Sequence, residues 1–254
     1  MNYLTNSSVF HPPRPLVVFP PAELDPVCDE LWREHRVASS VLHHPAPRCV
    51  ALYCHGNAEN IHLCADFAAA LSREACATVY SIEYPGYFRD EHGVAPSSER
   101  ALNAAAAAAA SRLARQPLPL LLVGYSLGSA PTVHAAGTDA VRGCNAMLVL
   151  MAPLVGALRT QLAGGGLLAA LVSPIDVFRT DVIAATLALK AAVVFHGTED
   201  KVIPTWHGQR VADALKAHTP QVKFWALPGV NHDTVRAEAL PIMGRSVSTW
   251  LDAE

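Results

Sequence analysis

The chain has 254 residues, of which 51% are hydrophobic and 16% are charged, and its formal net charge is −3. That length accommodates one α/β domain with a sizeable core, and a charged fraction below the roughly 25% of average globular proteins argues against a disordered or coiled chain. The slightly negative charge offers no electrostatic basis for binding nucleic acid, so we expect no nucleic-acid partner.

Apolar strands and helical segments alternate along the chain. The first forty residues are rich in proline, and we expect them to wrap the core and to add edge strands. Runs of apolar residues predict strands at 50–53, 78–82, 118–123, 146–151, 192–196 and 222–227. Helical spacing and alanine content predict helices at 59–75, 97–115, 129–137, 206–217 and 235–251. Apolar strands separated by helices are typical of a mostly parallel sheet covered on both faces, and since no linker is visible we expect a single α/β domain over residues 1–254.

One connection is longer than a single crossover helix requires. About forty residues separate the strands at 146–151 and 192–196, which predicts a small cap-like insertion over about 154–189. This segment is rich in Leu, Val and Ala, and together with Tyr87 and Phe88 it could line an apolar acyl pocket. The alternative is that these residues pack in the core.

The stretch Gly124-Tyr125-Ser126-Leu127-Gly128 lies between a predicted buried strand and a predicted helix. A Gly-x-Ser-x-Gly motif alone is weak evidence, but this strand–turn–helix setting is the one a nucleophile elbow needs. The two glycines permit a turn too tight for side chains, and the start of the helix favours developing negative charge. We therefore identify Ser126 as the candidate nucleophile.

A serine hydroxyl needs a base, and the base needs an acid to orient it. His232 follows the last predicted strand in a loop marked by glycine and asparagine, which makes it the candidate base. The stretch HGTEDKVIP after the strand at 192–196 offers Glu199 and Asp200, and adjacent residues cannot both face one imidazole. The 32-residue gap from Asp200 to His232 fits one helix plus one strand, which is the expected next unit of the fold. Asp233 is expected to cap the loop locally.

A tetrahedral intermediate also needs donors for its oxyanion. One is expected to be the backbone N–H of Leu127, directly after the nucleophile, and the other that of Asn57 (or, as an alternative, Ala58) in the loop HGNAEN. His55 could instead ligate a metal, but no partner histidine lies at the spacing of a zinc motif. We expect no metal and no cofactor.

Five motifs together resemble the α/β-hydrolase superfamily, and within it the group of Bem46-like proteins and ABHD17 depalmitoylases. They are HGNAEN (55–60), YSIEYPGY (80–87), GYSLGSAP (124–131), HGTEDKVIP (196–204) and PGVNHDTV (228–235). The resemblance implies the α/β-hydrolase fold, with a mostly parallel central sheet of about eight strands, helices on both faces and a small insertion after the sixth strand. Its catalytic triad falls on Ser126, Asp200 and His232, and its chain order agrees with the order derived from the residues.

The chain departs from that group in two places. The loop after YPGY reads FRDEHG (88–93), which puts substrate specificity in doubt, and the N-terminal cysteine cluster of the depalmitoylases has one counterpart here, Cys28. Stable membrane anchoring normally needs two signals. No signal peptide or membrane-spanning stretch is recognisable, and the six scattered cysteines are typical of reduced thiols. We expect a cytoplasmic protein with at most peripheral membrane contact.

These features predict a serine hydrolase that cleaves carboxylic ester or thioester bonds through an acyl-enzyme. The expected substrate is a small-molecule or lipid-like acyl ester or thioester, or an acylated protein as in the depalmitoylases. The alternatives are a lipase- or lysophospholipase-like esterase and a serine peptidase, since one triad serves all of these reactions. A non-catalytic binding protein on the same fold is the remaining alternative, and a complete triad argues against it.

Overall fold

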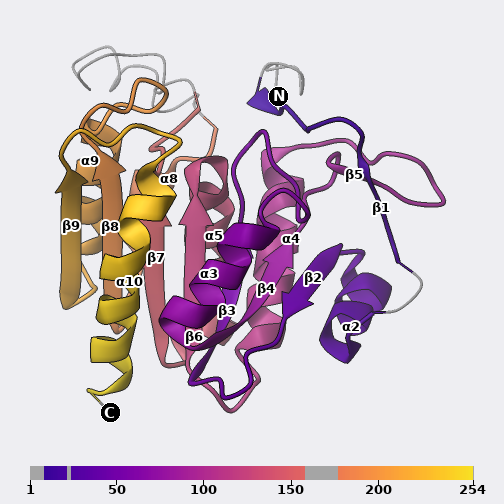
Figure 1. Cartoon of the computed structure of the whole chain (residues 1–254), viewed down its shortest axis with the longest axis horizontal. Helices are drawn as coiled ribbons and strands as arrows, with labels where there is room; N and C mark the ends of the chain where they lie inside the picture. Colours follow the sequence, from indigo (N-terminus) through magenta and orange to yellow (C-terminus); the bar gives the residue numbers. More distant parts are fainter. Residues whose placement is uncertain (1–8, 22–23, 158–176, 254) are drawn as a thin grey trace.

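The computed structural model describes residues 9–21, 24–157 and 177–253. Its centre is a seven-stranded sheet in which only the edge strand β2 runs antiparallel to its neighbour (Figure 1). In spatial order the strands are β2 (Ser39–Leu42), β4 (Ala77–Ile82), β3 (Cys49–Cys54), β6 (Leu120–Tyr125), β7 (Ala146–Met151), β8 (Ala191–Gly197) and β9 (Gln221–Leu227). All six strands predicted from apolar runs are present, each within two residues of its expected limits.

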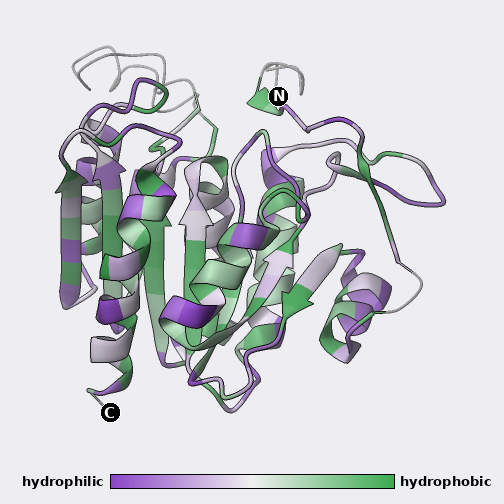
Figure 2. Cartoon of the chain, viewed as in Figure 1, coloured by the Kyte–Doolittle hydropathy of each residue, from purple (hydrophilic) through white to green (hydrophobic). Residues whose placement is uncertain are grey.

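Helices cover both faces of this sheet. Those on one face are α3 (Ala65–Ala75) and α10 (Val235–Leu251). Those on the other are α4 (Glu99–Leu113), α5 (Ser129–Ala136), α8 (Thr180–Ala184) and α9 (Trp206–Leu215), with the short α6 (Asp139–Arg142) after α5. The inner strands are hydrophobic along their length, whereas hydrophilic residues gather on the outer sides of the helices (Figure 2). The sheet therefore divides the core into two apolar layers, as the continuous apolar strands predicted.

The alanine-rich stretch forms the middle of α4. Ala105, Ala106, Ala109 and Ala110 are buried in the same apolar layer as the side chain of Leu52 on β3. A methyl side chain lets a helix lie close to a sheet while keeping high helix propensity. The stretch is therefore a packing surface of the core.

Two local predictions differ from the structure. The helix expected from residue 59 begins only at Ala65, because the Asn60 side chain accepts hydrogen bonds from the backbone N–H groups of His62 and Leu63 and holds a turn there. Helix α2 (Pro26–His35) was not predicted within the proline-rich segment, although Asp25 caps its first turn and proline stands at its first position.

The N-terminal segment wraps the core and supplies edge strands, as expected. β2 forms one edge of the main sheet, and β1 (Val17–Val18) pairs with β5 (Phe88–Arg89) in a separate two-stranded sheet. Phe88 packs there against Phe19 and Trp32. The main sheet thus has seven strands in the described part of the chain, against about eight expected.

The predicted insertion follows β7, the fifth strand of the main sheet in chain order. Its described parts are 154–157 and 177–189, and the prediction for 158–176 falls outside the described residues. Within the parts of the chain that the structure describes, no helix has the length and hydropathy needed to cross a bilayer.

Candidate active site

The chain reverses its direction of travel through the sheet between β3 and β6. From β3 it crosses to β4 on one side, then returns past β3 to β6 on the other. Connections leaving β3 and β6 therefore separate at their carboxyl ends, where open α/β sheets form a ligand-binding crevice. Asn57 follows β3 and Ser126 follows β6, so both stand at this crevice.

Ser126 occupies a strained turn between β6 and α5. Its φ is +51°, a left-handed conformation that costs a non-glycine residue about 1–3 kcal/mol. A Cβ on Gly124 would lie 2.8 Å from the Cα of Ser129, and one on Gly128 would lie 2.1 Å from the carbonyl oxygen of Cys54. Both distances are too short for any side chain. The two glycines of the motif therefore have the steric role expected from the sequence.

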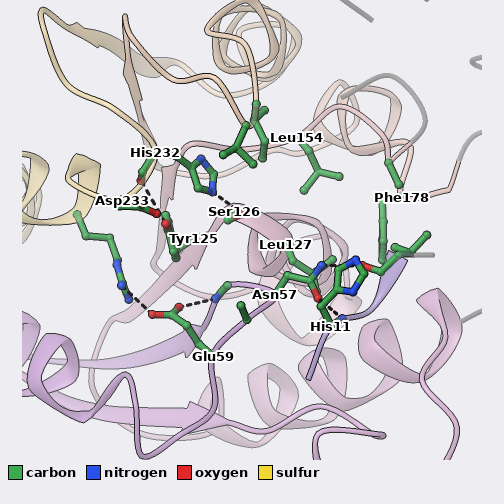
Figure 3. Close-up of a pocket in the computed structure, with 17 residues that line it drawn as sticks. His11, Asn57, Glu59, Tyr125, Ser126, Leu127, Leu154, Phe178, His232 and Asp233 are labelled. Carbon is green, nitrogen blue, oxygen red and sulfur yellow. Dashed lines mark hydrogen bonds and ion pairs between the residues drawn. The ribbon is translucent and has the colours of Figure 1, made fainter. Parts of the chain in front are cut away.

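The structure brings Ser126, His232 and Asp200 together in one hydrogen-bonded row (Figure 3). Nε2 of His232 lies 3.0 Å from Oγ of Ser126, and Nδ1 lies 2.7 Å from Oδ2 of Asp200. All three residues are largely buried. Glu199, the alternative acid, is exposed and does not join the row. With a neutral imidazole, the hydrogen on Nδ1 points to the carboxylate and leaves Nε2 as the acceptor for the serine proton.

The turn after β8 fixes the Asp200 carboxylate. Oδ1 accepts hydrogen bonds from the backbone N–H groups of Val202 and Ile203, at 2.9 and 2.8 Å. The His196 ring lies on the other side, with Nε2 3.4 Å from Oδ2. Burial opposes the charge, but hydrogen bonds from His196, His232 and Ile203 hold the pKa of Asp200 well below its usual range. The carboxylate therefore stays ionised beside His232.

Sequence analysis assigned no role to His196, which stands at the end of the predicted strand 192–196, directly before the glycine of HGTED. Its Nε2 donates to the carbonyl oxygen of Ile203 at 2.7 Å, and the ring is fully buried. The residue therefore supports the turn that carries Asp200. Its spacing of four residues from Asp200 was the available signal.

The loop after β3 carries the candidate oxyanion donors, and the N-terminal segment holds its Asn57 side chain. Oδ1 of Asn57 accepts a hydrogen bond from the backbone N–H of His11 at 2.8 Å and another from the Tyr87 hydroxyl. Its Nδ2 donates to the carbonyl oxygen of Val9 at 2.6 Å. Asn57 and Leu127 line the same cavity as the nucleophile. This places the two proposed backbone donors near Ser126 and fixes the residue that carries one of them.

His55 lies beneath this loop and is fully buried. Its Nδ1 lies 2.8 Å from the carbonyl oxygen of Gly56, and its Nε2 lies 2.9 Å from Oε1 of Glu83. Because both ring nitrogens face acceptors, neither is directed at a metal position. Burial opposes protonation, yet the charge and hydrogen bond of Glu83 raise the pKa of His55 overall. Glu83 also accepts from the backbone N–H of Ile61, so the pair ties the loop to the strand end of β4.

A second charged pair joins the same loop to helix α10. Oε2 of Glu59 accepts the backbone N–H of Gly56 at 2.9 Å, while Oε1 lies 2.7 Å from Nη2 of Arg236. Arg236 also donates to the Tyr53 hydroxyl at 3.1 Å and lies 4.4 Å from the ring centre of Tyr125. These contacts link the oxyanion loop, the residue before the nucleophile and the helix that follows His232. Sequence analysis did not identify this ion pair. The available indication was that Arg236 lies four residues, about one helical turn, after the candidate base His232.

Ser126, His232 and Asn57 line a cavity of about 480 Å³. Its apolar lining includes Leu154, Ala157 and Phe178 from the predicted insertion. Tyr87 and Phe88, which sequence analysis also considered for an acyl pocket, do not line it: both side chains are buried in the core, the alternative left open. The unusual stretch at 88–93 supplies no lining residue either, because β5 pairs with β1.

The chain is similar in sequence to curated proteins and similar in fold to solved structures, whereas no protein-family model matches the sequence. The chain is 28% identical over 214 residues to alpha/beta hydrolase domain-containing protein aho-3 of Caenorhabditis elegans, which covers 82% of this chain and 59% of aho-3. It is 29% identical over 170 residues to human alpha/beta hydrolase domain-containing protein 17C, which covers 65% of this chain and 47% of that protein. The matches thus span roughly half the length of these relatives.

Solved structures of esterases align with most of the chain. An esterase from Pyrobaculum calidifontis aligns with a TM-score of 0.61 at 17% identity, over 88% of each chain. The carboxylesterase EstE1, cloned from a metagenomic library, aligns with a TM-score of 0.60 at 18% identity, over 85% of each chain. The protein has the α/β-hydrolase fold. The fold and the resemblance expected from the sequence are therefore confirmed, and the candidate triad stands at the crevice of that hydrolase fold.

Proposed function

We propose that the protein is a serine hydrolase that cleaves carboxylic ester or thioester bonds through an acyl-enzyme. The observation that carries this proposal is the row of hydrogen bonds from Asp200 through His232 to Ser126, with distances of 2.7 and 3.0 Å, opening into a cavity. A structural role alone does not require a serine in a strained turn to face an imidazole that is itself held by a carboxylate.

The proposed reaction has two steps. Oγ of Ser126 attacks the carbonyl carbon while its proton passes to Nε2 of His232, and the backbone N–H groups of Asn57 and Leu127 stabilise the oxyanion. His232 then gives that proton to the leaving oxygen or sulfur, and the bond to the acyl carbon breaks. Water, deprotonated by His232, attacks the acyl-enzyme and releases the carboxylic acid and Ser126. Asp200 stabilises the imidazolium in both steps.

The lining of the cavity supports the proposed substrate class. Leu154, Phe178, Val202 and Ile203 provide apolar surface next to Ser126, which suits the acyl chain of a small-molecule or lipid-like ester or thioester. The resemblance of the five sequence motifs to the depalmitoylase group extends the proposal to acyl groups carried on proteins, with a thioester as the scissile bond. The proposed reaction is the same whichever molecule carries the acyl group, and it does not require a membrane.

Labelling with a fluorophosphonate probe tests the nucleophile. We expect the wild-type protein to label and Ser126→Ala to remain unlabelled. Ser246→Ala is the matched control, because Ser246 lies on α10 and, among the described residues, its hydroxyl bonds only to the Ile242 carbonyl oxygen of the same helix. It should label as the wild type does. An unlabelled wild type, or equal labelling of Ser126→Ala, contradicts the proposal.

Acyl selectivity is measured with p-nitrophenyl esters of two to sixteen carbons beside an acyl thioester and a palmitoylated peptide. We expect the highest kcat/KM above acetate length, because the apolar end of the cavity gains contact with each methylene. Activity restricted to acetate would exclude an acyl pocket, and cleavage of an amide alone would favour the peptidase alternative.

A further inference from the structure

The cavity has two chemically different ends with Ser126 between them. Leu154 and Phe178 lie on one side of the nucleophile in Figure 3, whereas Asp233, Tyr125 and Glu59 lie on the other. The first side provides the apolar surface of Leu154 and Phe178, with His11 and Asn57 on the same side, and the other carries the Glu59 and Asp233 carboxylates. An ester substrate is also two-ended, since the acyl chain and the leaving group depart from the carbonyl carbon in different directions.

The two ends fix the direction of the substrate, and this step rests on the proposed function. The carbonyl oxygen must point to the backbone N–H groups of Asn57 and Leu127, and the leaving atom must stand beside Nε2 of His232 to receive its proton. An apolar acyl chain is stabilised at the end formed by Leu154 and Phe178. The leaving group is thereby directed to the charged end.

The charges at that end do not cancel. Glu59 and Arg236 neutralise each other across 2.7 Å, and Arg236 is further engaged by the Tyr53 hydroxyl. Asp233 differs from them. It is exposed, its backbone N–H is held by the Asn231 side chain at 3.0 Å, and among the described residues its carboxylate has no hydrogen bond or ion pair. One uncompensated negative charge thus faces the space where the leaving group must lie.

We propose that the Asp233 carboxylate makes the cavity select leaving groups by charge, preferring amino alcohols and cationic thiols over anionic leaving groups. A cation placed near this carboxylate is attracted, while a sulfonate, carboxylate or phosphate at the same place is repelled. Arg236 does not reverse this preference, because Glu59, Tyr53 and the Tyr125 ring already occupy its guanidinium. The loop position that follows the catalytic base thereby determines specificity on the leaving-group side.

Three esters with one acyl group test the proposal. Butyrylcholine carries a cation, 3,3-dimethylbutyl butyrate is its neutral isostere, and 2-sulfoethyl butyrate is anionic. For the wild type we expect kcat/KM to fall in that order, by about 2- to 5-fold per step, as for an exposed charge pair. The differences should shrink as salt increases, because exposed charges are screened.

Variants locate the effect at one residue. Asp233→Asn should bring the three kcat/KM values within about twofold, and Asp233→Lys should reverse their order. Glu199→Gln is the matched control: it removes an exposed carboxylate from the neighbouring loop that does not line the cavity, and it should keep the wild-type order.

The outcomes separate the two proposals. If the wild type hydrolyses all three esters equally, or if Asp233→Asn keeps the order, charge selection by Asp233 is wrong while the hydrolase proposal stands. If the wild type hydrolyses none of them and does not react with a fluorophosphonate, both proposals fail together.

Discussion

The ion pair between Glu59 and Arg236 should couple the stability of the protein to its activity. The charged atoms lie 2.7 Å apart, and the two side chains are only 16% and 21% exposed. Unit charges about 4 Å apart attract by about 4 kcal/mol at an effective dielectric constant near 20. Desolvation and the remaining solvent contact offset part of this, so we expect Arg236→Met to lower the free energy of unfolding by about 2 kcal/mol.

The effect on activity follows from the second oxygen of Glu59. That oxygen accepts the backbone N–H of Gly56, the residue before the proposed oxyanion donor Asn57. Without Arg236 the carboxylate is free to turn toward water, the loop loses its anchor, and kcat for a neutral ester should fall by about tenfold. Glu59→Gln retains an oxygen that can accept from Gly56, so it should lose stability but keep more of kcat.

A double-mutant cycle measures the coupling, with urea unfolding and kcat determined for the wild type, Glu59→Gln, Arg236→Met and the double variant. We expect the double variant to lose about 1–2 kcal/mol less than the sum of the single variants, because each single change leaves one partly buried charge without its counter-ion. Additive losses within about 0.5 kcal/mol would refute a structural role for the pair.

Three further predictions concern other parts of the site. Asp200→Asn should lower kcat by roughly 10³- to 10⁴-fold with folding retained, measured by steady-state kinetics beside circular dichroism. Because Glu83 raises the pKa of buried His55, the folded state binds this proton more tightly than the unfolded state. The stability advantage of the wild type over His55→Gln should thus be present at pH 5.5 and decrease toward pH 9 in urea unfolding; an increase would contradict the pair. Leu154→Trp should lower the octanoate-to-acetate ratio of kcat/KM at least about tenfold, by filling the apolar end.

The candidate site was largely predictable because each of its catalytic residues lies in a short motif directly after a predicted strand. Ser126 and Asp200 follow the buried strands β6 and β8, and His232 follows the partly exposed strand β9. The carboxyl ends of these parallel strands meet at one edge of the sheet. The pattern of apolar runs therefore placed three distant residues in one crevice. The family resemblance placed the acid on Asp200, because spacing to the base does not separate it from the adjacent Glu199.

The supporting contacts were not predictable, because they join residues whose separation carries no periodic signal. His11 bonds to Asn57 across 46 positions, and Arg236 bonds to Tyr53 across 183. The orientation of Tyr87 was not predictable either, because an aromatic residue near a pocket motif can form a pocket wall or pack in the core. Its side chain packs in the core, and its hydroxyl donates a hydrogen bond to Asn57. Tertiary packing decides such cases.

The hydrogen bonds from Val9 and His11 to Asn57 make the beginning of the described chain part of the proposed catalytic apparatus. Every strand of the main sheet lies after residue 38, so a shorter version starting at Pro15 would retain that whole sheet. It would nevertheless remove two of the three hydrogen bonds that hold the side chain of Asn57, whose backbone N–H is a proposed oxyanion donor. Anyone who trims or tags this terminus should therefore expect altered turnover from a protein that still melts cooperatively.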